Sequence, residues 1–141
     1  MVNVRKLIGE QRELYRSLKS IYCPILEENV FFTSEGFYHL IYESNHIPRN
    51  VSEQILKLSF LQYVPDAIKN CSNLSETRKR KRKINRKYRK VLYYQLVYEF
   101  EKGRKVRVVL ERIGNGKVKF KSVMPHNRRS KTKSPEGANL L

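Results

Sequence analysis

The chain has 141 residues and a mass of 16.8 kDa, the size of one domain. Its 30 Lys and Arg residues exceed its 13 Asp and Glu residues, which gives a formal net charge of +17 at pH 7. This excess favours a polyanionic partner, nucleic acid before an anionic membrane surface. No apolar run approaches the roughly 18 residues of a membrane-spanning helix, and residues 1–10 lack a signal-peptide core, so we expect a cytoplasmic protein without a membrane span.

The two cysteines, Cys23 and Cys71, exclude a disulfide scaffold and a zinc site built from four cysteines. We expect both to be reduced structural thiols.

The positive charge is confined to the second half of the chain. Residues 1–77 carry a net charge of −1, whereas residues 78–141 carry +18. Ten of the thirteen residues in Arg78–Lys90 are basic. A run this dense requires solvent or an anionic ligand around it, so it is a solvated linker, a nuclear-localisation-like patch or a contact surface for a polyanion.

Three helices are expected in the first half. Apolar residues recur with helical spacing over residues 3–21, where Pro24 marks the end of the helix. A short β-type run at residues 30–33 precedes Ser34, the expected N-cap of a second helix through Tyr42.

The third helix is expected to begin at Ser52, after a break at residues 47–50, and to end near Tyr63. It is apolar on much of its circumference, so we expect it to lie centrally in the core. The Pro65–Asp66 pair interrupts it, and residues 67–70 add one further turn.

The second half changes to a period of two. Residues 92–100, 106–110 and 118–124 alternate apolar and polar side chains, with Gly-containing turns between them. They predict a three-stranded antiparallel meander with one apolar face. The fold class is therefore α+β, with N-terminal helices packed on one face of a C-terminal antiparallel β-sheet. We expect one domain over residues 1–125 and a basic, disordered tail over residues 126–141.

The other face of this sheet is expected to be basic and partly aromatic. It would carry Tyr93, Gln95, Glu99, Arg107, Glu111, Lys119 and Lys121.

Common nucleotide, zinc and hydrolase motifs are absent, and the acids are too scattered for a two-metal nuclease site. A metal-free, cofactor-free reaction remains, in which the 2′-hydroxyl of RNA attacks the adjacent phosphate. That reaction needs a base, an acid and cations that stabilise the phosphate charge.

Three histidines are candidates for the acid and base. His39 lies on a short helix at the edge of the expected core, where a hydrogen-bonded structural role is at least as plausible as catalysis. His46 lies in the following loop, seven residues on, so both side chains are able to face one cleft. His126 follows the last strand beside two arginines and belongs either to a site or to the tail.

Other candidates lie on the strands. Ser122 shares the inward phase of the last strand with Val118, Phe120 and Met124, as a small core residue or as a hydroxyl directed at phosphate. Arg107 and Lys119 are placed to clamp phosphate from the open face or to form cationic surface. The expected nucleic-acid-binding residues are Arg78, Lys79, Arg80, Lys81, Arg82, Lys83, Arg86, Lys87, Tyr93 and Lys121.

The segment from Phe32 to Leu40, the Val64–Ile68 segment, the alternating strands 93–100 and 106–110, and Phe120–Pro125 together resemble a known family. It is the barnase–EndoU–colicin–RelE superfold of small metal-independent ribonucleases, in its branch associated with phages and mobile elements. The resemblance spans roughly residues 30–125, and the Arg78–Lys90 run departs from its pattern by being more basic.

The resemblance implies that His39 is the family's helix histidine and Ser122 its last-strand hydroxyl. It also implies a toxin or effector that cleaves RNA and is neutralised by an acidic partner protein. His46, Arg107 and Lys119 are candidates from chemistry alone. A non-catalytic RNA- or DNA-binding protein remains the main alternative, because it requires the charge and the aromatic residues and nothing of His39. A membrane-surface or nuclear-addressed interaction module is the third possibility.

Overall fold

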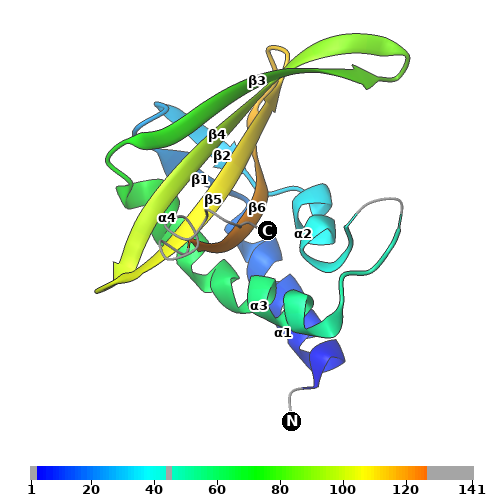
Figure 1. Ribbon diagram of the computed structural model, residues 1–141, viewed down its shortest axis with the longest axis vertical. Coiled ribbons are helices and arrows are strands. Elements are labelled where there is room, and N and C mark those ends of the chain that lie inside the picture. Colours follow the sequence, from blue (N-terminus) through cyan, green and yellow to red (C-terminus); the bar gives the residue numbers. More distant parts are fainter. Residues whose placement is uncertain (1–2, 44–45, 127–141) are drawn as a thin grey trace, which may run out of the picture.

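A computed structural model describes residues 3–43 and 46–126. It is an α+β protein in which the helices pack on one face of a strongly twisted sheet, as the sequence predicts (Figure 1). The elements in chain order are α1 (Val4–Leu18), β1 (Ser20–Cys23), β2 (Glu28–Phe31), α2 (Ser34–Ile41), α3 (Val51–Phe60), a 3₁₀ turn (Leu61–Tyr63), α4 (Val64–Asn70), β3 (Leu74–Ile84), β4 (Lys87–Glu101), β5 (Arg104–Ile113) and β6 (Val118–His126). Among the described helices, none is both long and apolar enough to cross a bilayer.

The sheet has six strands in the order β1-β2-β6-β5-β4-β3. The predicted meander is confirmed as β4, β5 and β6, since β4 pairs antiparallel with β5 and β5 pairs antiparallel with β6. Two strands that the sequence analysis did not expect, β1 and β3, lie at the two edges of the sheet. The pairing of β2 with β6 is parallel and joins the early part of the chain to its last strand.

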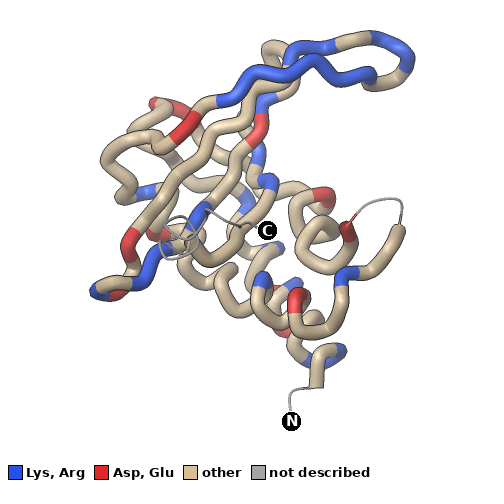
Figure 2. The backbone as a smooth tube through the Cα atoms, in the orientation of Figure 1, with Lys and Arg blue, Asp and Glu red and all other residues tan. Residues whose placement is uncertain are grey.

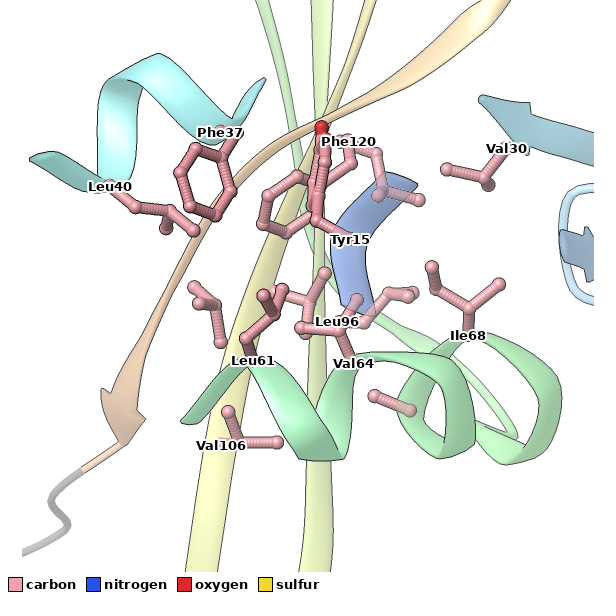
Figure 3. Close-up of a cluster of buried hydrophobic side chains, with 14 of the residues drawn as sticks. Tyr15, Val30, Phe37, Leu40, Leu61, Val64, Ile68, Leu96, Val106 and Phe120 are labelled. Atoms are coloured by element: carbon pink, nitrogen blue, oxygen red, sulfur yellow. The ribbon is translucent and has the colours of Figure 1, made fainter. Parts of the chain in front are cut away.

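The core lies between the helices and one face of the sheet (Figure 3). Leu96 of β4 and Val108 of β5 are both fully buried, which confirms the predicted register. Leu40, Leu61 and Ile68 meet them from the helices. Both cysteines are buried and carry free thiols.

Two helix boundaries differ from expectation. The first helix ends at Leu18, because Lys19 adopts a left-handed backbone (φ 51°) and residues 20–23 then form β1. The third helix is capped by Asn50 rather than Ser52, since the Asn50 side chain accepts a hydrogen bond from the Glu53 backbone N–H at 2.8 Å.

The Pro65–Asp66 pair begins a helix instead of interrupting one. Pro65 lies in the first turn of α4, where a backbone N–H has no partner within the helix. The predicted single turn is therefore the longer helix α4, Val64–Asn70.

The basic run Arg78–Lys90 is a β-hairpin, not a linker. Its strands pair from Arg78–Tyr93 to Ile84–Lys87, and a two-residue turn joins them. Asn85 and Arg86 have φ values of 51° and 68°, the mirror-image turn that fits the twist of paired strands. Pairing of β4 with β5 begins at Val91, so residues 81–90 form a two-stranded ribbon that extends beyond the remaining described chain (Figures 1 and 2).

A β-bulge in β6 changes the phase of the last strand. Val109 pairs with Ser122 whereas Leu110 pairs with Phe120, so Lys121 is an extra residue between them. Phe120 and Val123 are therefore both buried, and Ser122 leaves the inward phase that the sequence analysis assigned to it.

The end of β6 extends past the predicted boundary of the domain. His126 pairs with Lys105 of β5 and so belongs to the sheet rather than to the tail. The rest of the predicted tail, residues 127–141, lies outside the described residues.

Candidate functional site

Helix α2 is held close to the sheet by a glycine. A Cβ atom on Gly36 would lie 2.4 Å from the Tyr15 hydroxyl oxygen and 2.8 Å from the Phe120 carbonyl oxygen, so no larger residue fits without movement. The Tyr15 hydroxyl donates a hydrogen bond to the Thr33 carbonyl at 2.6 Å, just before α2 begins. These contacts position the His39 side chain, one turn further along the helix, beside β6.

The His39 imidazole is mostly enclosed, with 23% of its side chain exposed. Its Nε2 atom is buried without a hydrogen-bond partner among the described residues, and the Glu35 carboxylate lies 3.8 Å away. Burial lowers the pKa of His39, and the positive charge of Lys121 lowers it further. At neutral pH the imidazole is therefore neutral and able to accept a proton.

Lys57 of α3 reaches two neighbouring residues of β6, Ser122 and Val123. Its Nζ atom donates to the Val123 carbonyl at 3.1 Å and lies 3.4 Å from the Ser122 hydroxyl. The residue is 6% exposed, and burial lowers the pKa of its ammonium group to about 8. A lysine with this pKa is protonated at neutral pH and is a far better proton donor than an exposed lysine.

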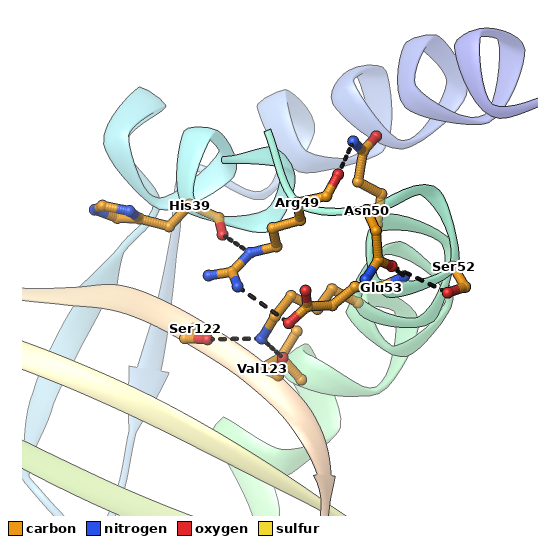
Figure 4. Close-up of polar contacts among 9 residues, drawn as sticks. His39, Arg49, Asn50, Ser52, Glu53, Ser122 and Val123 are labelled. Atoms are coloured by element: carbon orange, nitrogen blue, oxygen red, sulfur yellow. Dashed lines mark hydrogen bonds and ion pairs between the residues drawn. The ribbon is translucent and has the colours of Figure 1, made fainter. Parts of the chain in front are cut away.

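Arg49 connects the two helices that carry these groups. Its Nε atom donates to the His39 carbonyl at 2.9 Å, and its Nη1 atom pairs with Glu53 of α3 at 3.2 Å (Figure 4). The Gln54 side chain donates to the Arg49 carbonyl at 2.7 Å. The end of α2 and the start of α3 are thereby fixed relative to each other.

A second polar group lies on the open face of the sheet around Glu111. This carboxylate is 3% exposed, accepts a hydrogen bond from Arg82 at 2.9 Å and lies 3.9 Å from the Lys121 ammonium. Arg82 also donates to the Tyr93 hydroxyl at 2.6 Å. Burial raises the pKa of Tyr93, and the Glu111 charge raises it further, so the phenol stays protonated at neutral pH.

The Glu111 group and the His39 group interact electrostatically. The charges of both Lys121 and Glu111 act on the His39 imidazole. Lys121 thus pairs with the buried carboxylate and also lowers the pKa of His39 through its charge. The bulge described above produces this arrangement, because Lys121 is the inserted residue.

Arg107 is a further cation on the open face of the sheet. Its Nε atom is buried and makes no hydrogen bond within the described chain. The side chain lines a pocket of about 280 Å³ together with Arg78, Arg80 and Tyr93. Its charge also contributes to the lowered pKa of Lys57, which places it within electrostatic range of the Ser122 edge.

The structure brings most of the predicted site residues together and leaves one apart. His39, Ser122, Arg107 and Lys121 all belong to the groups just described. Lys119 lies on β6 directly opposite Glu111.

His46 lies elsewhere. Its Nδ1 atom shares a hydrogen bond of 2.6 Å with the Tyr38 hydroxyl, on an exposed loop next to α2. The Tyr38 ring contacts both imidazoles, with its centroid 6.1 Å from that of His39 and 5.8 Å from that of His46.

Nine of the ten predicted nucleic-acid-binding residues lie on β3, β4 and the turn between them, and the tenth, Lys121, lies on β6. All eight between Arg78 and Lys87 belong to the β3–β4 hairpin, and Tyr93 follows on β4.

The sequence analysis did not name Lys57, and it placed Glu111 on the open face of the sheet without expecting its burial; both side chains are buried. Lys57 follows Leu56 and precedes Leu58 on an apolar helix, and that placement is a usable signal of burial. Glu111 follows Leu110 on an alternating strand, and in sequence it does not differ from an exposed residue of the outer face. Its burial depends on Arg82 and Lys121, which lie far from it in the sequence or on another strand.

No group of three or more His, Cys, Asp or Glu side chains suited to a metal ion occurs in residues 3–43 and 46–126. No protein-family model, curated protein or solved structure matches the chain.

Proposed function

We propose that the protein is a metal-independent RNA endonuclease that cleaves by attack of the ribose 2′-hydroxyl on the adjacent phosphate. The observation that supports it is the presence around β6 of a neutral histidine, a lysine of lowered pKa within 3.4 Å of a serine hydroxyl, and further cations, from positions 39, 57, 107, 121 and 122. This combination supplies a base, an acid and cations for the phosphate.

His39 is the base in this scheme. Its neutral imidazole takes the proton from the 2′-hydroxyl, and the oxygen that this releases attacks phosphorus. Lys57 is the acid, and its Nζ gives a proton to the departing 5′-oxygen. The products are a 2′,3′-cyclic phosphate and a 5′-hydroxyl, and proton exchange with water restores both side chains.

The remaining groups of the site stabilise charge and hold substrate. Lys121 and Arg107 lie beside the negative charge that develops on the phosphoryl oxygens and stabilise it. Lys119 contributes a further positive charge. Ser122 lies next to Lys57 and donates to a phosphoryl oxygen. Glu111 holds Arg82 and Lys121 in place through its ion pairs.

The scheme predicts a bell-shaped pH dependence of kcat/KM. Activity falls at acidic pH as His39 becomes protonated, below its ordinary pKa of about 6.5, because that pKa is lowered. Activity falls at alkaline pH as Lys57 loses its proton, near its pKa of about 8. Replacing Lys57 with Arg lowers the rate and abolishes the alkaline limb, because a guanidinium does not deprotonate in this range.

The direct test is incubation of the pure protein with RNA in EDTA, followed by analysis of the ends for 2′,3′-cyclic phosphate. His39→Ala is expected to lower cleavage about 10²–10⁴-fold with RNA affinity nearly unchanged. His46→Ala is the matched control, because it removes the histidine that lies beside Tyr38. Equal cleavage by wild type and a folded His39→Ala protein contradicts the role of His39, and loss in His46→Ala alone transfers that role to His46.

A non-catalytic RNA- or DNA-binding protein is the second candidate. The basic hairpin favours it, because six of the seven Lys and Arg residues in 81–90 are exposed and need no chemistry to bind phosphate. Binding of RNA without cleavage under any of the conditions above establishes this alternative.

The proposed ribonuclease acts in the cytoplasm and has an acidic protein as its partner. A ribonuclease of this kind acts on RNA in the cytoplasm and requires neutralisation there, and an acidic protein that covers the basic open face would supply it. Co-purification of such a protein at low salt, and its release at high salt together with recovery of cleavage, is the expected result.

A further inference from the structure

The alternating sequence Arg-Lys-Arg-Lys-Arg-Lys sorts by residue type once it becomes a strand. Side chains of a strand alternate between its two faces. The cross-strand pairs show that Arg78, Arg80, Arg82 and Arg89 share one face of the hairpin. Lys79, Lys81, Lys83 and Lys90 share the other face. We name these sets the arginine face and the lysine face; the arginine face also carries Lys87 next to the turn.

The arginine face is continuous with the candidate active site. Arg78 pairs with Tyr93, which pairs with Glu111, which in turn pairs with Lys119 across the sheet. Arg82 joins the two surfaces through its contacts with Tyr93 and Glu111. The lysine face continues instead into the helix-covered side, since Lys79 pairs with Leu92.

The pocket of about 280 Å³ lies where the arginine face meets the sheet. Three guanidinium groups line it, from Arg78, Arg80 and Arg107, and Tyr93 supplies an aromatic ring. One carboxylate, Glu76, also lines the pocket and pairs with Arg78 at 2.6 Å. The cations outnumber this acid, and the Arg107 Nε atom is buried without a hydrogen-bond partner in the described structure. The pocket therefore suits a phosphate group next to a stacked base.

We propose that the arginine face, from this pocket to the hairpin turn, binds successive phosphates of the RNA strand on one side of the cleaved bond, and that the lysine face does not. This inference rests on the proposed ribonuclease function. It assigns the substrate class: an RNA that extends several nucleotides past the cleavage site, rather than a dinucleotide.

The dimensions of the hairpin agree with such a substrate. Six residues separate Tyr93 from Lys87, and a strand rises about 3.3 Å per residue, so the arginine face reaches roughly 20 Å from the active site. Phosphates follow one another at about 3.4 Å along the axis of a stacked strand, so this reach spans about six nucleotides. Guanidinium groups bind phosphate with two parallel hydrogen bonds, which an ammonium group does not do.

The experiment compares two triple variants of equal charge on the two faces of one hairpin. The first is Arg78→Gln, Arg80→Gln and Arg89→Gln; the second is Lys79→Gln, Lys81→Gln and Lys90→Gln. Arg82 is left unchanged because it pairs with Glu111. All six replaced residues are exposed, so both variants are expected to fold as the wild type does.

Two substrates are used, an RNA of about 12 nucleotides and a mixture of dinucleoside monophosphates. The arginine-face variant is expected to lower kcat/KM on the long RNA roughly 10-fold or more and to lower cleavage of the dinucleotides much less, because a dinucleotide does not extend along the hairpin. It is also expected to flatten the salt dependence of RNA binding by about two units of log Kd per log salt, since each phosphate contact on a single strand contributes about 0.7. The lysine-face variant is expected to change these quantities little.

A third variant, Arg78→Lys, Arg80→Lys and Arg89→Lys, separates geometry from charge. This variant keeps the positive charge, so the salt dependence of RNA binding is expected to stay as in the wild type. Its affinity for the long RNA is expected to fall, because lysine does not form the paired hydrogen bonds of arginine. Equal effects of the two Gln triples on binding and cleavage would overturn the inference and leave the ribonuclease intact. Absence of RNA cleavage by the wild type would instead contradict the proposed function. In that case the affinities of the two Gln variants for uncut RNA still show which face of the hairpin binds the RNA.

Discussion

The β3–β4 pair contains two regions that differ in what stabilises them. Near Leu96 the strands are covered by helices, and burial of apolar side chains holds them in place. Beyond Val91 the same two strands form a ribbon with both faces in solvent, held by cross-strand pairs and a tight turn. The charges that a phosphate-binding surface needs are costly to bury, so the chain places them where the sheet has left its core.

The comparison also shows how one backbone geometry serves two purposes. Alternation places Leu96, Val106 and other apolar side chains against the helices. The same alternation on the ribbon separates arginines from lysines. A period of two is therefore present along the whole hairpin, while the property that alternates changes from hydropathy to the type of cation.

The largest expected effect compares the stability of the two regions directly. Leu96→Ala removes a fully buried side chain, so it should lower the free energy of unfolding by about 2–5 kcal/mol. Tyr88→Ala removes a side chain of the ribbon that is 73% exposed, and should change that free energy by less than about 0.5 kcal/mol. Urea unfolding followed by circular dichroism measures both, and similar losses would show that the ribbon is part of the cooperative core.

The next effect is a pH dependence of stability that arises from Lys57. Its folded pKa of about 8 lies below the ordinary value of 10.5, so the unfolded chain binds more protons between these pH values. Stability contributed by this residue therefore rises as the pH increases from 8 to 10, by roughly 2–3 kcal/mol. Lys57→Met should lack this rise relative to the wild type, which unfolding at pH 7 and pH 10 measures. Parallel curves for the two proteins would mean that Lys57 is solvated.

A smaller effect tests how α2 is attached to the covered region. Tyr15→Phe removes the hydrogen bond to the Thr33 carbonyl and is expected to cost about 1 kcal/mol. His39 depends on this attachment for its position, so cleavage should fall together with stability. Gly36→Ala, which places a Cβ atom against the same hydroxyl, should act in the same direction more strongly.

The smallest effect concerns the ribbon alone. Arg86 has a left-handed φ of 68°, which glycine adopts without strain. Arg86→Gly should slow amide hydrogen exchange within residues 81–90 while changing the global free energy of unfolding by less than about 0.5 kcal/mol. Faster exchange in the ribbon would contradict the assigned turn.

The sequence by itself determined the fold class, the three central strands and the region that carries the charge. Local signals are sufficient there, because strands such as 92–100 and 106–110 alternate hydropathy with a fixed period. The helix that carries His39 was predicted to within one residue at each end: Thr33 is its N-cap instead of Ser34, and it ends at Ile41 instead of Tyr42.

Tertiary structure decided the rest. The hairpin formed by residues 78–90 has no apolar alternation, so its hydropathy pattern does not indicate strands. The strands are defined by their pairing in the sheet, which includes pairing of β3 with Val91–Tyr94 of β4. The inserted Lys121 shifts Ser122 by one position, and a bulge depends on the register of the neighbouring strand. Lys57 and Glu111 are ordinary charged residues in sequence. They belong to the site because α3 meets the β6 edge and because Arg82 and Lys121 meet over β5, and contacts between residues so distant in the chain have no local signature.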